Sequence, residues 1–451
     1  MKTKKRRLEP LSFYDHTGIE KHLAKMAERG WMIERITNQF WTYRKIEPQT
    51  LQFAVTYYPK ANDFAPAPTD AQQTFYDFSA RTGWELACTW FQMQIFCSTT
   101  ENPIPIDTDP VYEVETIHKA CKANYLRAYW FLMIVGLVGT YFLISGLIGH
   151  TLHFFSSPSN MVTYTCAFLL FLMCAVELWT YYTWHKKATR AAEDGIFMDT
   201  PSTAPFQRVI LTVLVISFAL WIINLVFAKN ALMVCIAALV FGAIFGTKYM
   251  GEAVKRFYKR KRLSAGLNRV LTFLTTFVFG LVLMGTALTV GTLLSRNEAF
   301  SESLRIEEAP LKVQDLMETD YQGHITLTSP DSSLLLSRLE VEQRHHFDDE
   351  PSPEIPAMKY ELYQVRAAFL YDFFARQMRR IALLDSKDGV SMTERDPAPW
   401  GANAAYQLVA ADGSALNRFV LCYENRLVDI EMNWTLTEEQ KVIAGEKLSI
   451  K

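Results

Sequence analysis

Long apolar runs divide the chain into three parts. Five stretches rich in apolar residues occur between about residues 128 and 294, whereas the flanking parts mix polar and apolar positions over short distances. A helix needs roughly 20 apolar residues to cross the hydrocarbon of a bilayer, where it satisfies its own backbone hydrogen bonds. The pattern therefore predicts a membrane α-helical protein with about five transmembrane helices, at residues 128–149, 161–184, 209–228, 231–247 and 270–294. The fourth stretch is short, so the sequence leaves open whether it crosses fully.

The N-terminal part, residues 1–109, contains an internal repeat. The run from Ala27 to Ile33 matches the run from Ala80 to Leu86, with a Gly followed by a Trp in each. A Gly at the end of an amphipathic helix is typical of a left-handed C-cap, and the Trp then begins a strand. Thr17 and Thr69 fit capping boxes at the two helix starts. Alternating apolar positions predict further strands at 39–46, 51–57 and 91–95, hence a two-layer α+β domain, with a ferredoxin-like fold as one candidate.

Residues 110–126 predict a juxtamembrane helix that leads into the first apolar stretch. Beyond the last stretch, residues 297–451 predict a second, acidic α+β domain. Its expected elements are an amphipathic helix over 359–384, a hairpin formed by 417–423 and 426–434, and a final helix that Thr437 caps. Cys422 is the one cysteine of this part, so an internal disulfide is excluded there.

Charge is sorted along the chain in a way that indicates topology. Basic and acidic residues balance before residue 127, basic residues exceed acidic ones by ten over 127–296, and acidic residues exceed basic ones by eleven after that. The basic residues gather in the loops after the second and fourth stretches, while the loop after the first has none. Because basic loops stay in the cytoplasm, we expect a multi-pass protein with a cytoplasmic N-terminal domain and an extracytoplasmic C-terminal domain.

Several short runs in the first quarter of the chain resemble a known family, the bacterial membrane proteins that carry domain of unknown function 2812. The runs agree with that family in order and spacing, and they are Phe13-Tyr14-Asp15, Lys25 to Trp31, Lys45 to Pro48, Tyr57 to Lys60, Gly83-Trp84-Glu85 and Glu101 to Ile106. The resemblance implies a bacterial plasma membrane. It brings no activity and no catalytic residues, because the family has none assigned.

Glu177 is the acidic residue that lies clearly inside a predicted span. A carboxylate buried in lipid is costly and often functional, so Glu177 is a possible intramembrane functional residue. It lies about two helical turns from the basic end of its span, so a structural role is the alternative. In that case the side chain would reach the interface or pair with another helix.

A polybasic cluster follows the fourth apolar stretch. Lys255, Arg256, Lys259, Arg260, Lys261 and Arg262 surround Phe257 and Tyr258. Such a cluster attracts anionic lipids with about 1 kcal/mol per charge. The alternative is that it only fixes the topology, and nucleic acid is not an expected partner.

No motif indicates an enzyme, so the chain has no expected catalytic, cofactor-binding or metal residues. The run His345-His346 with Asp348, Asp349 and Glu350 offers metal-capable side chains but matches no known ligand spacing. The favoured hypothesis is a non-enzymatic transmembrane sensor or regulator. It would contact the lipid bilayer and, through either soluble domain, protein partners. The alternatives are a membrane enzyme or transporter subunit that uses Glu177 or a lipid-facing cleft, or a scaffold of a larger membrane complex.

Overall fold

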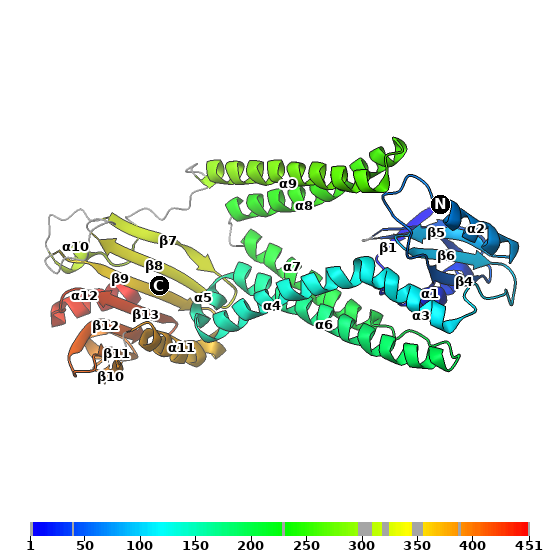
Figure 1. Cartoon of the computed structure of the whole chain (residues 1–451). Coiled ribbons are helices and arrows are strands. Elements are labelled where there is room, and N and C mark those ends of the chain that lie inside the picture. Colours follow the sequence, from blue (N-terminus) through cyan, green and yellow to red (C-terminus); the bar gives the residue numbers. More distant parts are fainter. Residues whose placement is uncertain are drawn as a thin grey trace. The chain divides into compact units, whose positions relative to one another are not determined.

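The computed structural model describes residues 3–37, 40–227, 231–295, 309–317, 324–344, 355–386 and 389–449 (Figure 1). The described residues form two compact units. The first takes in residues 1–138, 166–216 and 238–288, and the second takes in 139–165, 217–237 and 289–451. Each unit combines one sheet-containing domain with parts of the apolar helices.

The N-terminal domain is built from two copies of one β-α-β-β unit, drawn in blue in Figure 1. In each copy the last strand lies between the other two and pairs antiparallel with both, so the sheet orders are β1-β3-β2 and β4-β6-β5. The elements are β1 (Lys4–Arg7), α1 (His16–Glu28), β2 (Trp31–Ile36) and β3 (Trp41–Lys45), then β4 (Gln52–Tyr57), α2 (Asp70–Arg81), β5 (Glu85–Trp90) and β6 (Met93–Ser98). The two separate three-stranded sheets replace the single sheet of a ferredoxin-like fold, so that candidate is wrong.

The predicted repeat of helix, Gly, Trp and strand is confirmed. Gly30 and Gly83 follow α1 and α2 with φ of +78° and +89°, in the left-handed region that favours glycine. A β-bulge follows three residues after the glycine in both copies, at Ile33 and Leu86. The cap at Thr69 is confirmed by a bond from Gln72 N, whereas α1 is capped by Asp15 and not by Thr17.

The apolar part of the chain is helical. Its elements are α3 (Pro110–Ala120), a five-residue π-helical turn η1 (Cys121–Tyr125), α4 (Leu126–Ile148), α5 (Thr151–Ser156), α6 (Pro158–Glu193), α7 (Ala204–Phe227), α8 (Ala231–Arg260) and α9 (Ala265–Ser295). Within the described residues, four helices are long and apolar enough to cross a membrane. They are Pro110–Ile148, Pro158–Glu193, Ala204–Asn224 and Ala265–Leu293. The predicted fourth span coincides with the first part of α8, a continuous helix of 30 residues. Residues 231–237 of this span lie outside the residues whose side chains the structure describes, so the comparison with the four helices does not extend to it.

The C-terminal domain contains a seven-stranded antiparallel sheet of order β10-β11-β12-β13-β9-β8-β7, drawn from yellow to red in Figure 1. The elements are α10 (Val313–Leu316), β7 (His324–Ser332), β8 (Leu336–Arg344), β9 (Met358–Val365), η3 (Ala368–Leu370), α11 (Tyr371–Leu384), β10 (Ser391–Arg395), η4 (Ala398–Trp400), β11 (Ala404–Val409), β12 (Ala415–Cys422), β13 (Arg426–Met432) and α12 (Glu438–Ser449). Alternate residues of β12 enter two different cores. Phe419 and Leu421 pack with the residues of α10 and α12, while Val420 and Cys422 pack with those of α11. Both faces of the sheet are therefore covered.

One predicted helix of this domain is wrong in its first part. Residues 358–365 form strand β9, and the helix α11 begins only at Tyr371. Met358, Tyr360 and Leu362 are buried on alternate positions, and β9 pairs with β8 and β13 on its two sides. The predicted hairpin is confirmed as β12 and β13. The final helix is confirmed too, with reciprocal bonds between Thr437 and Gln440 at its start.

Candidate functional site

Glu177 lies on α6 with 1% of its surface exposed, and its carboxylate is the centre of a buried polar cluster. The hydroxyl of Tyr125 donates a hydrogen bond to Oε1. Thr203 Oγ1 and Gln207 Nε2 donate to Oε2 at 2.6 and 3.0 Å. Hydrogen bonds to a charged acceptor contribute roughly 1.5–3 kcal/mol each, so these three donors offset the cost of removing the carboxylate from water.

The donors come from different elements, so Glu177 joins three helical segments. Tyr125 is the last residue of the π-helical turn η1, and Gln207 lies in the first turn of α7, just after Thr203. A π-turn is a rare local widening of a helix that is often found at functional positions. Here the turn immediately precedes the apolar helix α4 and ends at the tyrosine that bonds to Glu177.

The cluster reaches the N-terminal domain through Ser12. Its hydroxyl lies 2.8 Å from Thr203 Oγ1 and accepts a bond from Gln207 Nε2 at 3.1 Å. Ser12 is 3% exposed and stands in the linker between β1 and α1. Ser12, Tyr125, Glu177, Thr203 and Gln207 are hereafter the Glu177 cluster.

A second set of buried hydrogen bonds lies beside this cluster at the start of α1. Asp15 is fully buried, and its Oδ1 accepts bonds from Gly18 N at 3.0 Å and from Thr200 Oγ1 at 2.7 Å. Thr17 Oγ1 lies 2.8 Å from the same threonine hydroxyl. A Cβ atom at Gly18 would lie 2.3 Å from Asp15 Oδ2, so any other residue there would displace the Asp15 carboxylate from its present bonds. The segment that precedes α7 is thus bound to the first turn of α1.

Aromatic side chains enclose both sets of bonds. Tyr14 is fully buried, and its ring centroid lies 5.1 Å from that of Tyr181 and 5.7 Å from that of Trp184, both on α6. Burial raises the pKa of Tyr14 far above its ordinary value, and the negative charges of Glu177 and Asp15 add to the effect. The phenol therefore stays neutral. The hydrophobic core of the N-terminal domain continues without interruption into α3, α4 and α6.

The polybasic cluster is only partly available to lipid. Lys255 Nζ lies 2.7 Å from Asp63 Oδ2 and 2.8 Å from Glu252 Oε1, and Lys259 Nζ lies 3.7 Å from Asp63 Oδ1. Asn268 of α9 donates a hydrogen bond at 2.8 Å to the carbonyl oxygen of Phe64, the residue after Asp63. These contacts hold α8 and α9 to the loop between β4 and α2. Arg256, Arg260, Lys261 and Arg262 form no ion pair within the described residues.

Among the residues that the structure describes, no group of three or more His, Cys, Asp and Glu side chains could hold a metal ion. The run at 345–350 lies outside the described residues. The Glu177 cluster offers hydrogen bonds between a carboxylate and neutral donors. Such bonds suit a role in holding η1, α6 and α7 together.

Sequence reasoning singled out Glu177 but missed Ser12, Tyr125, Thr203 and Gln207. Glu177 and Ser12 are far apart in the chain, and no local spacing connects them. One signal was present, because the Phe13-Tyr14-Asp15 run that carries the family resemblance lies directly beside Ser12.

Comparison with known proteins identifies the N-terminal region. No curated protein and no solved structure matches the chain. A family model described as "Protein of unknown function (DUF2812)" matches residues 15–132, which include the N-terminal domain from the start of α1 onward, with Tyr125 and the start of α4. The predicted resemblance is thereby confirmed: residues 15–132 of this chain are similar to domain of unknown function 2812.

Proposed function

We propose that this chain is a non-enzymatic sensor or regulator of a bacterial plasma membrane, with a cytoplasmic N-terminal domain, five spans and an extracytoplasmic C-terminal domain. The Glu177 cluster is the observation that carries the proposal. One carboxylate on α6 bonds to η1 and α7, and the same bonds include Ser12 of the N-terminal domain. A movement of α6 against α7 would therefore be passed directly to the N-terminal domain, which would in turn contact a cytoplasmic protein partner.

Contacts of the C-terminal domain with α5 support the outer half of the proposal. The ring of Phe155 lies 5.6 Å from that of Phe374 on α11, and its carbonyl oxygen accepts a bond from Ser333 Oγ at 2.7 Å. Leu152 is 2% exposed in the same core. Because α5 joins α4 to α6 in the chain, a ligand that shifts the outer domain would act on the helix that carries Glu177.

The sidedness is tested by labelling single introduced cysteines in intact cells with a membrane-impermeant maleimide. Ala71 in α2 and Ala415 in β12 are both exposed and suit the substitution to Cys. The proposal expects labelling of Ala415→Cys in intact cells and of Ala71→Cys only after lysis. The wild-type chain with its seven native cysteines gives the background. Equal labelling of both positions, or the reverse order, would refute the two-sided arrangement.

The coupling is tested by hydrogen exchange on the full chain in lipid nanodiscs. Glu177→Gln weakens the charge-assisted bonds, and the loss of about 1.4 kcal/mol corresponds to roughly tenfold faster exchange. We expect this acceleration in residues 11–18 and 199–207 but not in β4. Glu193→Gln, an exposed position on the same helix, is the matched control. Unchanged exchange around Ser12 would contradict a coupling role, and a loss of protection throughout the domain would make Glu177 a general folding residue.

A further inference from the structure

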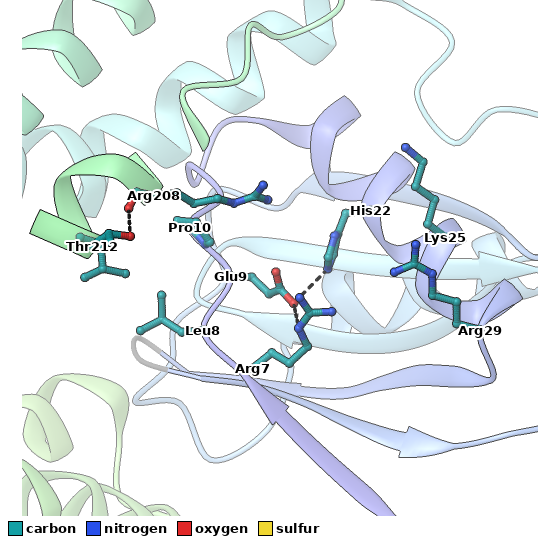
Figure 2. A pocket seen from close by; sticks show the side chains of 10 residues that line it. Arg7, Leu8, Glu9, Pro10, His22, Lys25, Arg29, Arg208 and Thr212 are labelled. Carbon is teal, nitrogen blue, oxygen red and sulfur yellow. Dashed lines mark hydrogen bonds and ion pairs between the residues drawn. The ribbon is translucent and has the colours of Figure 1, made fainter. Parts of the chain in front are cut away.

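A cavity of about 640 Å³ lies between the β1–α1 linker, α1 and the beginning of α7 (Figure 2). Its lining includes the basic side chains of Arg7, Lys25, Arg29 and Arg208. In Figure 2, Arg208 comes from α7 on one side, and Lys25 of α1 and Arg29, the residue directly after α1, lie on the other. The cavity therefore collects cations from segments that are far apart in the sequence.

One acidic residue, Glu9, lines the cavity, and its carboxylate is already paired with Arg7 and His22. Glu9 Oε1 lies 3.0 Å from Arg7 Nε and 3.3 Å from His22 Nε2. Its side chain is only 3% exposed, and burial raises the pKa of Glu9. The His22 bond and the charges of His22, Arg7 and Arg208 outweigh burial, so the net shift of the Glu9 pKa is downward. The surroundings of the cavity thus favour negative charge.

Three cations of the cavity are not in direct contact with a carboxylate among the described residues. Within the described part of the chain, Lys25, Arg29 and Arg208 form no ion pair. All three residues are exposed, so water screens their charges in the free protein and a dissolved or membrane-bound anion can reach them. An anion that bears several oxygen atoms, such as a phosphate group, would match the donors of two guanidinium groups and one ammonium group.

The cavity continues toward the start of α7. A second hollow of about 250 Å³ shares His22, Lys25 and Arg208 with it and extends to Ala204 and Pro205. Ala204 is the first residue of this 24-residue helix. The N–H of Ala204 already donates to Ser202 Oγ at 3.4 Å, and Pro205 has no N–H, so the helix start contributes its partial positive charge to the attraction for an anion.

Apolar side chains lie at the other edge. Leu8 is 48% exposed, and Leu211 lies one turn beyond Arg208 on the helix whose residues 204–224 are apolar enough to cross a membrane. A freely dissolved phosphate compound gains nothing from such an edge. A membrane lipid does, because its headgroup and its acyl chains meet the cationic and the apolar parts together.

We propose that the cavity formed by Arg7, Lys25, Arg29 and Arg208 binds the phosphate-bearing headgroup of an anionic membrane lipid. The site is distinct from the polybasic cluster at 255–262, whose Lys255 is already paired. Lipid binding at this site requires only that α7 enters a bilayer, so it can be tested independently of the proposed sensor role. A bound headgroup bridges α1 and α7 and would hold the N-terminal domain against the membrane surface.

The test measures lipid binding to the full chain by native mass spectrometry, after reconstitution with phosphatidylcholine alone or with added phosphatidylglycerol. Arg29→Gln and Arg208→Gln should each weaken phosphatidylglycerol retention about fivefold, since a basic residue near a membrane contributes about 1 kcal/mol. Arg190→Gln removes an exposed charge from the end of α6 and should leave retention unchanged. Arg29→Lys keeps the charge and should retain most of the binding, which separates charge from misfolding.

Competition with millimolar inorganic phosphate distinguishes the two sources of the anion. Persistence of the bound lipid supports the proposal, whereas its complete displacement by phosphate would assign the cavity to a soluble phosphate compound. Equal retention of phosphatidylcholine and phosphatidylglycerol would overturn the proposal. So would equal losses in Arg208→Gln and Arg190→Gln.

Discussion

Replacing Glu20 by Gln is expected to stabilise the N-terminal domain at pH 8 and to have a much smaller effect at pH 5. Burial raises the pKa of Glu20 from its ordinary value of 4.5 to about 7, and the charges of Glu113 and Asp107 add to this. The N–H of Val55, which donates to Oε1 at 2.8 Å, and the charge of His16 act in the opposite direction without cancelling it.

The sign follows from proton linkage. The folded domain binds the Glu20 proton more tightly than the unfolded chain does, so the favourable contribution to stability is complete below pH 4.5. It is lost as the pH rises toward 7. The shift corresponds to about 3 kcal/mol at most, because each pKa unit is worth about 1.4 kcal/mol and the side chain keeps some contact with water. Gln keeps an oxygen that accepts the Val55 bond and removes the charge, so the variant should not show this loss.

Hydrogen exchange of β4 in the full chain provides the assay, because Val55 reports directly on the Glu20 contact. After correction for intrinsic rates, the free energy of opening in the wild type should fall between pH 5 and pH 8 relative to Glu20→Gln. Glu28→Gln, at an exposed position on the same helix, is the matched control. A difference between wild type and variant that does not change with pH would refute the reasoning, as would a wild type that gains stability with rising pH.

Two glycine substitutions test close packing. In the C-terminal domain, Gly445→Ala would place a Cβ atom 2.2 Å from the carbonyl oxygen of Trp400. We expect the free energy of unfolding to fall by about 1–3 kcal/mol, measured as faster hydrogen exchange in α12. Exchange equal to that of the wild type would contradict this contact. In the helical part, Gly136→Ala would bring a Cβ atom 2.7 Å from Phe171 N, so α4 and α6 must separate locally and the melting temperature in detergent should fall. Gly242→Ala in α8 is the control, because an added Cβ atom there would have nothing within 4 Å outside its own helix backbone, and an equal change in both variants would contradict the argument.

Local patterns were sufficient for the repeated part of the N-terminal domain. The glycines at 30 and 83 and the tryptophans that follow them mark the helix ends and strand starts, because a left-handed backbone position and an apolar strand start both leave signals in a few residues. The strand β1 was missed since Lys4–Arg7 contains only basic residues. Its place in the sheet comes from backbone pairing with β3, which no side-chain alternation records.

Tertiary context decided the remaining cases. The mixture of apolar and polar residues over 359–365 fits a helix as well as a strand, and the pairing of β9 with β8 and β13 selects the strand. The hydrogen-bond partners of Glu177 likewise could not be predicted from the sequence pattern. The helical spacing shows a carboxylate in an apolar span, but the hydroxyls of Ser12 and Thr203 meet it only when distant segments fold together.

The duplicated β-α-β-β unit has an unequal consequence for the two copies. In the first copy, the cap residue Asp15 bonds both to its own helix and to Thr200, shortly before α7, and a Cβ atom at Gly18 would clash with the Asp15 carboxylate. In the second, Thr69 caps α2 through a bond to Gln72, and Phe78 on that helix is 63% exposed. Tolerance to substitution should therefore differ between α1 and α2. The start of α1 contacts the segment before α7 and should tolerate few substitutions, whereas α2 should vary more among related proteins.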